Sequence, residues 1–201
     1  MGDKPILEII VKKLKQQGFN NLYISVNYQK EIIKKHFKNK KNFGVDIKFI
    51  EEPHQLGTLG SLGIFFKDYQ SKEPILVLNS DLYTNFNFKE LMHFHIKNKS
   101  KFTMVVREYE VNIPYGLIEI KKNKITKMVE KPKICNYVNS GIYVFDPEMK
   151  KYFKKLKKLN ANDFINQLLD SNIKINPFLM HEFWIDIGNQ SDLYKARSID
   201  V

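Results

Sequence analysis

Apolar residues in the first half of the chain recur in two rhythms, one typical of helices and the other of buried strands. From Pro5 to Gly18 they follow the helical spacing, and Pro at the first helical position with Gly just past the last is a typical pair of helix boundaries. Short apolar runs then alternate with helix-like stretches, which predicts strands at 22–26, 45–50 and 75–78 and helices at 31–37 and 59–66. This alternation predicts right-handed crossovers and a parallel sheet.

After residue 81 the pattern becomes that of a mixed sheet with antiparallel parts. A helix is predicted at 88–97, and strands follow at 102–107, 115–120, 125–130 and 138–145. Lys122 and Asn123 lie between two of these strands and predict a tight hairpin turn. The tail predicts a short Lys-rich helix from Pro147, a helix at 161–169, a strand at 173–178 and a last helix at 190–196.

The length of 201 residues, 43% of them hydrophobic, accommodates one domain with a sizeable core. No apolar run is long enough to span a bilayer, and the first residues, Met1-Gly2-Asp3-Lys4, carry no apolar signal segment. We therefore expect a cytoplasmic protein without a membrane partner. Cys135 is the one cysteine, so no internal disulfide is expected and we interpret it as a free structural thiol.

The net charge of +11 raises the hypothesis of a nucleic-acid-binding protein. Of the 33 basic residues, however, only Arg107 and Arg197 are arginine, the residue that specific nucleic-acid contacts favour. The lysines are spread along the chain, so we interpret them mainly as solvated surface with a modest attraction for phosphorylated substrates. Nucleic-acid binding is therefore the least favoured function.

Two acidic residues far apart in the sequence are candidate metal ligands. Asp81 follows the apolar run 75–78, which places it at the carboxyl end of a buried strand, where open α/β sheets bind ligands. Asp186 lies in the segment Trp184-Ile185-Asp186-Ile187-Gly188. Carboxylate oxygens suit Mg²⁺, so the two residues predict a magnesium site with a catalytic role. Each could also be structural, Asp81 capping the next turn and Asp186 preceding a helix.

Polar residues between these acids are candidates for binding a sugar phosphate. Lys131 offers a positive charge for the phosphate, while Glu130 and Asn139 offer oxygens that accept hydrogen bonds from sugar hydroxyls. The structural alternatives are a surface ion pair at Glu130-Lys131 and a turn at Asn139. Earlier in the chain, the segment Leu56-Gly57-Thr58 precedes a helix, and a Gly there would let a nucleotide base approach the backbone.

Seven short motifs in order resemble the sugar-phosphate nucleotidyltransferase family, which includes mannose-1-phosphate guanylyltransferases and glucose-1-phosphate thymidylyl- and uridylyltransferases. The motifs are Lys4-Pro5-Ile6-Leu7-Glu8, Leu56-Gly57-Thr58, Ser80-Asp81, Tyr115-Gly116, Glu130-Lys131-Pro132, Asn139-Ser140-Gly141-Ile142-Tyr143 and Trp184-Ile185-Asp186-Ile187-Gly188. Each motif alone is weak, but their order is specific and covers nearly the whole chain.

The resemblance implies a Rossmann-like α/β fold for nucleotide-diphospho-sugar transfer, as a single domain with a mixed sheet flanked by helices. Residues 1–100 would form its nucleotide-binding half and residues 101–201 its sugar-phosphate-binding half. It also implies that Gly57 contacts the base and that Asp81 and Asp186 hold Mg²⁺. Around the sugar phosphate the implied residues are Gly116, Glu130, Lys131 and Asn139. The implied substrates are a nucleoside triphosphate with a sugar 1-phosphate, or the nucleotide sugar.

Two departures from the family pattern change the expectation. Ser80-Asp81 stands where the family usually has Gly-Asp, which should leave the carboxylate in place. The sequence also lacks the family's first strand and its Gly-Gly-x-Gly-Thr-Arg loop, which binds the triphosphate and supplies the catalytic Arg. Without that strand, the strands at 22–26 and 75–78 would lie about 10 Å apart, twice the spacing of paired strands. Three explanations remain open: the sheet closes up, another segment or chain fills the gap, or the sequence is a fragment of a longer protein.

Three functions stay open at this point. The favoured one is a nucleotidyltransferase that forms a nucleotide sugar and pyrophosphate, represented by an incomplete and impaired chain. The second is a non-catalytic subunit that binds a sugar phosphate or a nucleotide sugar. The third is the basic nucleic-acid-binding protein. Exposed strand edges also lead us to expect a homo-oligomer.

Overall fold

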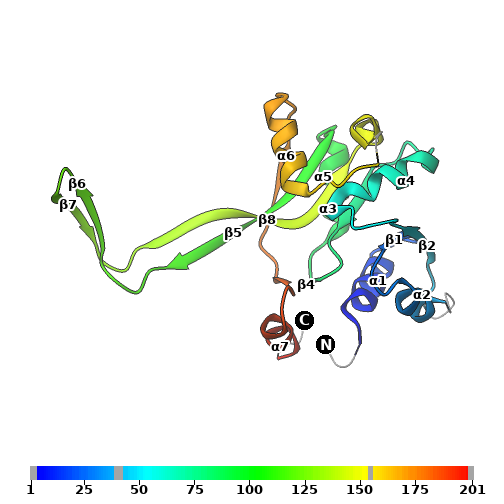
Figure 1. Ribbon diagram of the computed structural model, residues 1–201, viewed down its shortest axis with the longest axis horizontal. Helices are drawn as coiled ribbons and strands as arrows, with labels where there is room; N and C mark the ends of the chain where they lie inside the picture. Colours follow the sequence, from blue (N-terminus) through cyan, green and yellow to red (C-terminus); the bar gives the residue numbers. More distant parts are fainter. Residues whose placement is uncertain (1–3, 39–42, 154–155, 199–201) are drawn as a thin grey trace.

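The computed structural model describes residues 4–38, 43–153 and 156–198 and shows a mixed α/β protein (Figure 1). Its first half alternates helices and strands as the sequence predicts, with two differences: the helix expected at 59–66 is divided into α3 and α4, and a short strand, β4, was not predicted. The elements are α1 (Ile6–Gln16), β1 (Asn21–Val26), α2 (Lys30–Phe37), β2 (Asp46–Glu51), α3 (Gly57–Gly60), α4 (Leu62–Asp68), β3 (Ile75–Leu78), β4 (Leu82–Thr84) and α5 (Phe88–Lys97).

The second half contains the predicted strands, two of them longer than expected, and a short strand near its end that the sequence pattern did not reveal. The elements are β5 (Phe102–Asn112), β6 (Leu117–Lys121), β7 (Lys124–Val129), β8 (Lys133–Phe145), the 3₁₀ segment η2 (Pro147–Phe153), α6 (Ala161–Asp170), β9 (Asn176–Met180), β10 (Trp184–Asp186) and α7 (Gln190–Arg197).

The largest sheet has four strands in the order β3-β8-β5-β9. Strand β8 is antiparallel to both of its neighbours, and β9 is parallel to β5. The prediction of a parallel sheet therefore holds for β1 with β2 but not for β3, which pairs antiparallel with β8. The reason is that β8 arrives from the antiparallel half of the chain and occupies the edge of β3.

Strands β1 and β3 each keep one ladder edge that no other strand of the described residues pairs. Strand β1 pairs with β2 alone, in a separate two-stranded sheet, and β3 pairs with β8 alone. All four apolar residues of β3 are only partly buried, whereas Phe102 and Val105 in β5 are fully buried. The apolar sequence of β3 is typical of a central strand. Among the described residues, however, β3 lies at the edge of its sheet and is only partly buried.

Helices pack against both strand systems and enclose the core. One apolar cluster joins α1 and α5 to the four-stranded sheet through residues such as Leu14, Leu91 and Val144. A second cluster, with Phe66, Phe145 and Phe164 among its members, joins α4 and α6 to the other side. Phe164 lies within ring-contact distance of Phe102, Phe145 and Phe153. The core therefore fixes the positions of β3, β5 and β8, which carry or precede several predicted site residues.

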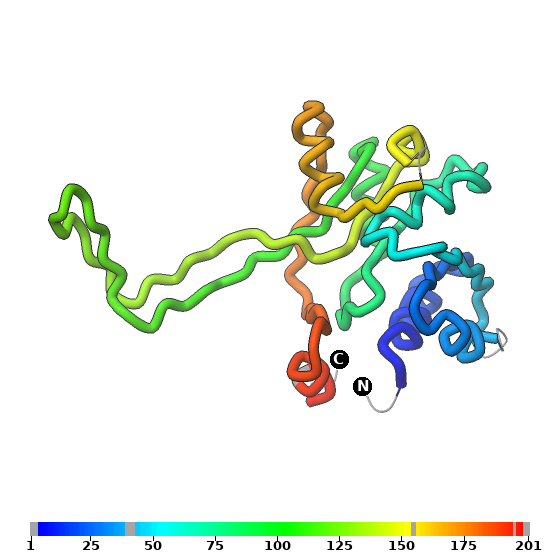
Figure 2. Tube along the Cα trace, in the orientation of Figure 1, coloured from blue at the N-terminus to red at the C-terminus, as the bar shows by residue number. Residues whose placement is uncertain are grey.

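A long two-stranded ribbon leaves this body and carries a hairpin at its far end (Figures 1 and 2). The ribbon consists of the outer parts of β5 and β8, paired from Val106–Asn139 to Asn112–Lys133. Beyond it, β6 and β7 pair with each other alone. The turn between them holds Lys122 and Asn123 at positive φ, as a two-residue hairpin turn of the primed type requires, so the predicted hairpin is confirmed.

None of the helices in the described ranges combines the length and the apolar character that crossing a membrane requires.

Candidate functional site

Three of the sequence motifs meet at the end of β3. The backbone N–H of Asn79 donates a hydrogen bond to the carbonyl oxygen of Gly141 at 3.0 Å. Gly141 has φ of +75°, and a Cβ there would lie 2.7 Å from the side-chain amide of Asn79. Glycine is thus required both by the backbone conformation and by the close approach. This contact fastens the Asn79-Ser80-Asp81 loop to the Asn139-Ser140-Gly141 turn.

The third motif joins them through Trp184 and strand β10. The indole Nε1 of Trp184 donates to the carbonyl oxygen of Ser140 at 3.0 Å. Strand β10 pairs antiparallel with β4, so that Asp186 lies opposite Leu82. The N–H of Ile187 then donates to the carbonyl oxygen of Asp81 at 2.9 Å. Segments more than a hundred residues apart in the sequence therefore present their acidic residues side by side.

The electrostatics of Asp81 and Asp186 fit a bound cation. Partial desolvation raises the pKa of Asp186, and repulsion from Asp81 and Asp192 raises it further, although much of the Asp186 side chain reaches solvent. Oδ1 of Asp81 is buried and has no hydrogen-bond donor among the described residues. A divalent cation would supply the missing partner and offset the repulsion. Mg²⁺ is commonly held by one or two carboxylates together with substrate phosphates.

The described residues contain no cluster of three or more His, Cys, Asp or Glu side chains arranged to hold a metal by themselves. A cation at Asp81 and Asp186 would therefore need ligands from its substrate. Asp81 and Asp186 do lie close together, as a shared site would require, and their role as magnesium ligands stays a prediction.

Arg107 supports the same site and was not a candidate in the sequence analysis. Its guanidinium donates hydrogen bonds to the carbonyl oxygens of Glu182 at 3.1 Å and Trp184 at 3.3 Å. It also lies 6.0 Å from the centre of the Trp184 ring. The scarcity of arginine in a lysine-rich chain is a signal that could have identified it, because a guanidinium can hold two carbonyls at once and an ammonium is a point charge.

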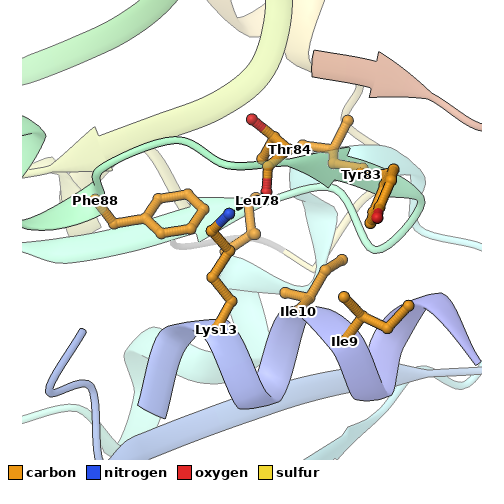
Figure 3. A pocket seen from close by; sticks show the side chains of 8 residues that line it. Ile9, Ile10, Lys13, Leu78, Tyr83, Thr84 and Phe88 are labelled. Carbon is orange, nitrogen blue, oxygen red and sulfur yellow. Dashed lines mark hydrogen bonds between the residues drawn. The ribbon is translucent and has the colours of Figure 1, made fainter. Parts of the chain in front are cut away.

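Lys13 ties helix α1 to the strand that follows Asp81. Its Nζ donates to the carbonyl oxygen of Thr84, and burial lowers its pKa while Glu182 opposes that shift. Figure 3 shows Lys13 and Ile10 of α1 facing Leu78 and Thr84. The cavity that these residues line has a volume of about 10 Å³. A cavity of that volume holds roughly one water molecule. The hydrogen bond from Lys13 to Thr84 therefore helps to position β4. The cavity beside it is too small for a substrate.

The predicted base-binding segment Leu56-Gly57-Thr58 is fastened to the chain before α6. The side chain of Leu56 is fully buried, and Oγ1 of Thr58 accepts the N–H of Ala161 at 2.7 Å. A Cβ at Gly57, where φ is +76°, would lie 2.5 Å from Oδ1 of Asn160. The space that the missing side chain of Gly57 leaves is therefore occupied by Asn160 of the same chain. Contact of the segment with a base stays a prediction.

The predicted sugar-phosphate residues are divided between the inner end of the ribbon and the base of the β6–β7 hairpin. Asn139 lies at the inner end of the ribbon, where its side chain donates to the Tyr143 hydroxyl and accepts the N–H of Gly141. Gly116 and Glu130 lie close together at the base of the β6–β7 hairpin, since a Cβ at Gly116 would be 3.2 Å from Oε2 of Glu130. Lys131 follows at positive φ of 43° with an exposed side chain. The structure thus separates these three residues from Asn139 and the two aspartates of the same chain.

Comparison with known proteins identifies relatives named mannose-1-phosphate guanyltransferases or guanylyltransferases. A mannose-1-phosphate guanyltransferase of Saccharomyces cerevisiae is 31% identical over 203 residues, covering 97% of this chain and 56% of the relative. The catalytic subunit beta of a mannose-1-phosphate guanylyltransferase of Xenopus tropicalis is 30% identical over 196 residues, covering 94% and 54%. The chain thus spans about half the length of the curated relatives it matches.

Solved structures show the same fold. HddC from Yersinia pseudotuberculosis, complexed with GMP-PN, aligns with a TM-score of 0.74 at 23% identity, over 97% of this chain and 85% of the other. A putative glucose-1-phosphate thymidylyltransferase from Bacillus anthracis aligns with a TM-score of 0.75 at 22% identity, over 100% and 85%. The sequence profile described as nucleotidyl transferase matches residues 1–200. Because this match covers nearly the whole chain, the chain belongs to the nucleotidyl transferase family.

Proposed function

We propose that this protein contributes the metal and sugar-phosphate part of a sugar-1-phosphate nucleotidyltransferase. In that reaction a phosphate oxygen of the sugar 1-phosphate attacks the α-phosphorus of a nucleoside triphosphate, and pyrophosphate leaves. The observation that carries the proposal is the meeting of Asp81 and Asp186 across the β4–β10 pair, with an unpartnered buried oxygen on Asp81. Membership of the family supports the reaction class.

Each candidate residue has a role that its chemistry supports. Asp81 and Asp186 would hold Mg²⁺, which neutralises charge on the reacting phosphates. Lys131 would bind the phosphate of the sugar 1-phosphate. Glu130 and Asn139 would accept hydrogen bonds from sugar hydroxyls, and Asn139 is oriented for this by its bonds to Tyr143 and Gly141.

The names of the relatives make GTP and mannose 1-phosphate the first substrates to test. GDP-mannose is then the matching nucleotide-sugar probe. A surface with net charge +11 favours phosphorylated ligands of either kind, so the charge does not discriminate among nucleotides. Other triphosphates and hexose 1-phosphates therefore belong in the same assay.

These 201 residues contain no Gly-Gly-x-Gly-Thr-Arg sequence, and we propose that turnover by them alone is negligible. The developing charge on the transferred phosphate needs fixed donors and a cation. Lys131 lies at the base of the β6–β7 hairpin and would face the sugar phosphate, so it cannot replace them. Loss of one comparable electrostatic contact lowers turnover by roughly a hundredfold to a thousandfold, and here an Arg and a whole loop would be lacking.

Pyrophosphate release from each nucleoside triphosphate, with mannose 1-phosphate and glucose 1-phosphate in turn, tests the proposal. We expect negligible release by the 201 residues, and turnover by a longer chain that carries the family's Gly-rich segment ahead of Lys4. The longer chain with Asp186→Asn is the matched control and should be inactive. Turnover of about one per second by the 201 residues would show that another group does the work of the loop.

A binding subunit without catalytic activity is the second candidate, because these 201 residues contain no Gly-Gly-x-Gly-Thr-Arg sequence. It predicts that GDP-mannose binds in a Mg²⁺-dependent way and that the longer chain is as inactive as the shorter one. The pyrophosphate assay on the longer chain therefore separates the two functions. Binding of random duplex DNA that weakens steeply with salt would instead revive the nucleic-acid hypothesis.

A further inference from the structure

The β6–β7 hairpin exposes an apolar face that nothing in the described part of the chain covers. Cross-strand partners lie on the same face of a two-stranded sheet, and the register pairs Ile118 with Met128 and Ile120 with Ile125. These four side chains are 44%, 64%, 68% and 69% exposed, respectively. An isolated two-stranded hairpin is marginally stable in water, so a partner surface on this face would stabilise the hairpin.

The ribbon that carries the hairpin is amphipathic in the same way. Val111 lies opposite Ile134 and shares a face with Tyr109, whereas Glu110 lies opposite Cys135 on the other face. Val111, Ile134 and Tyr109 are 45%, 40% and 54% exposed. Together, the ribbon and hairpin contribute ten of the eighteen large apolar residues that are exposed in the described part of the chain. Such a concentration marks an interaction surface.

The ribbon keeps the hairpin away from the aspartates of its own chain. From the Val106–Asn139 pair to the Asn112–Lys133 pair the ladder includes seven residues of β5, which extend over about 20 Å at the usual rise of a strand. The pairing continues one step further, because the N–H of Ile113 donates to the carbonyl oxygen of Pro132 at 3.2 Å. Folding back onto the same body would require this ladder to bend sharply or break, and Figure 2 shows the ribbon directed outward.

We propose that the ribbon and hairpin of one copy dock on the body of a second copy and bring Gly116, Glu130 and Lys131 to the partner's Asp81 and Asp186. The exchange is reciprocal, so that two copies related by a two-fold axis form two composite sites. This inference rests on the proposed function for the roles of these residues, while the dimer itself rests on the exposed apolar face.

Charge complementarity supports a docking position near the aspartates. Residues 117–131 contain five lysines and two glutamates, a net charge of +3. Near β10 the chain gathers carboxylates instead, and Asp81 and Asp192 both repel the Asp186 charge. In a protein of net charge +11, this group of carboxylates attracts a basic hairpin, whereas lysine-rich surfaces would repel it.

Sedimentation of the whole chain tests the dimer without reference to function. The wild-type protein should sediment at twice its mass of 23.8 kDa, and Ile120→Lys with Ile125→Lys should produce monomers with unchanged circular dichroism. Ile32→Lys with Ile96→Lys is the matched control, since these isoleucines on helices of the body are also exposed, at 64% and 53%. A monomeric wild type at high micromolar concentration, or dissociation by the control pair alone, would overturn the proposal.

Cross-linking tests the docking position, again independently of activity. In a Cys135→Ser background, one tagged copy carries Lys131→Cys and a second copy with another tag carries Asn189→Cys, close to Asp186 in sequence. A short bismaleimide should join the two tags when both variants are mixed. A single chain that carries both Lys131→Cys and Asn189→Cys is the comparison. If this chain forms the link internally, even at high dilution, the hairpin docks on the body of its own chain and the proposal is wrong.

Complementation then tests the composite site. Asp186→Asn and Lys131→Ala should each lose Mg²⁺-dependent binding of fluorescent GDP-mannose. Mixing equal amounts after dissociation should restore about one quarter of the sites, because half of the dimers combine both variants and each of those has one intact site. If the wild type binds GDP-mannose but the mixture of variants recovers no binding, the proposed exchange of hairpins between copies is wrong. A wild-type dimer that cross-links as expected but binds no GDP-mannose would instead count against the proposed function.

Discussion

Replacing Asp186 with Asn should stabilise the fold while removing Mg²⁺-dependent binding. The substitution keeps the shape of the side chain and the pairing of β10 with β4, but it removes a charge that partial desolvation and the carboxylates of Asp81 and Asp192 disfavour. If Asp186 had a structural role instead, Asp186→Asn would lower the stability of the fold. Helix α7 is capped by Asn189, whose side chain accepts the N–H of Asp192 at 3.1 Å, so Asp186 is not the cap.

The magnitude and the pH dependence follow from the same arrangement. Because the Asp186 side chain reaches solvent, we expect a gain of a few tenths to about 1 kcal/mol, the usual range for exposed charge pairs. The pKa of Asp186 is raised in the folded protein, so the folded state binds more protons than the unfolded state between the two pKa values. Wild-type stability therefore falls as the pH rises through that window, and the advantage of the variant reaches its full value above it.

Urea unfolding of both proteins at neutral pH, repeated at acidic pH, measures this advantage. Thermal unfolding with Mg²⁺ and GDP-mannose should show a rise in Tm for the wild type and none for Asp186→Asn. The control Asn189→Ala should lose about 1 kcal/mol, since it removes a helix cap. A loss of similar size in Asp186→Asn, or a Tm that still rises with Mg²⁺, would refute the assignment of Asp186 to the metal site.

Three further predictions concern the framework of the site and the core. Gly141→Ala should cost roughly 1–3 kcal/mol in urea unfolding, because the positive φ and the contact with Asn79 both resist a side chain; an unchanged midpoint would contradict this. Trp184→Phe should cost about 1 kcal/mol by losing the hydrogen bond to Ser140, and a neutral result would deny that bond a role. Burial lowers the pKa of His95, so stability should fall as the pH drops below about 6.5, a slope that His95→Gln should reduce.

The sequence predicted the meeting of Asp81 and Asp186 through motif order, although it gave no sign of the strands that achieve it. Strands β4 and β10 have three residues each, too few for an alternating pattern to be recognised. The hydrogen bond from Trp184 to Ser140 joins two motifs that the sequence places 44 residues apart. Such contacts depend on how the core positions β3, β5 and β8, which no local pattern encodes.

The ribbon was predicted only in part, for a different physical reason. The first strand of the ribbon was expected to end at residue 107, but β5 continues to Asn112. The second was expected to begin at residue 138, but β8 begins at Lys133. The missed residues do alternate, as in Glu108-Tyr109-Glu110-Val111. That alternation indicates a strand with one apolar face, but the face packs against nothing described in this chain, so burial could not be used to extend the strand.

The open ladder edges of β1 and β3 connect the fold to the chemistry. A strand between them would pair both edges and cover the half-buried residues of β3, restoring the environment that its apolar sequence favours. The resemblance to the family implies that such a strand leads into the Gly-rich loop, and β3 leads into Asp81. A single insertion would therefore complete the sheet and place triphosphate donors beside the aspartates. Completion of the fold and gain of activity would then be one event, since the same segment provides both the backbone partners and the catalytic loop.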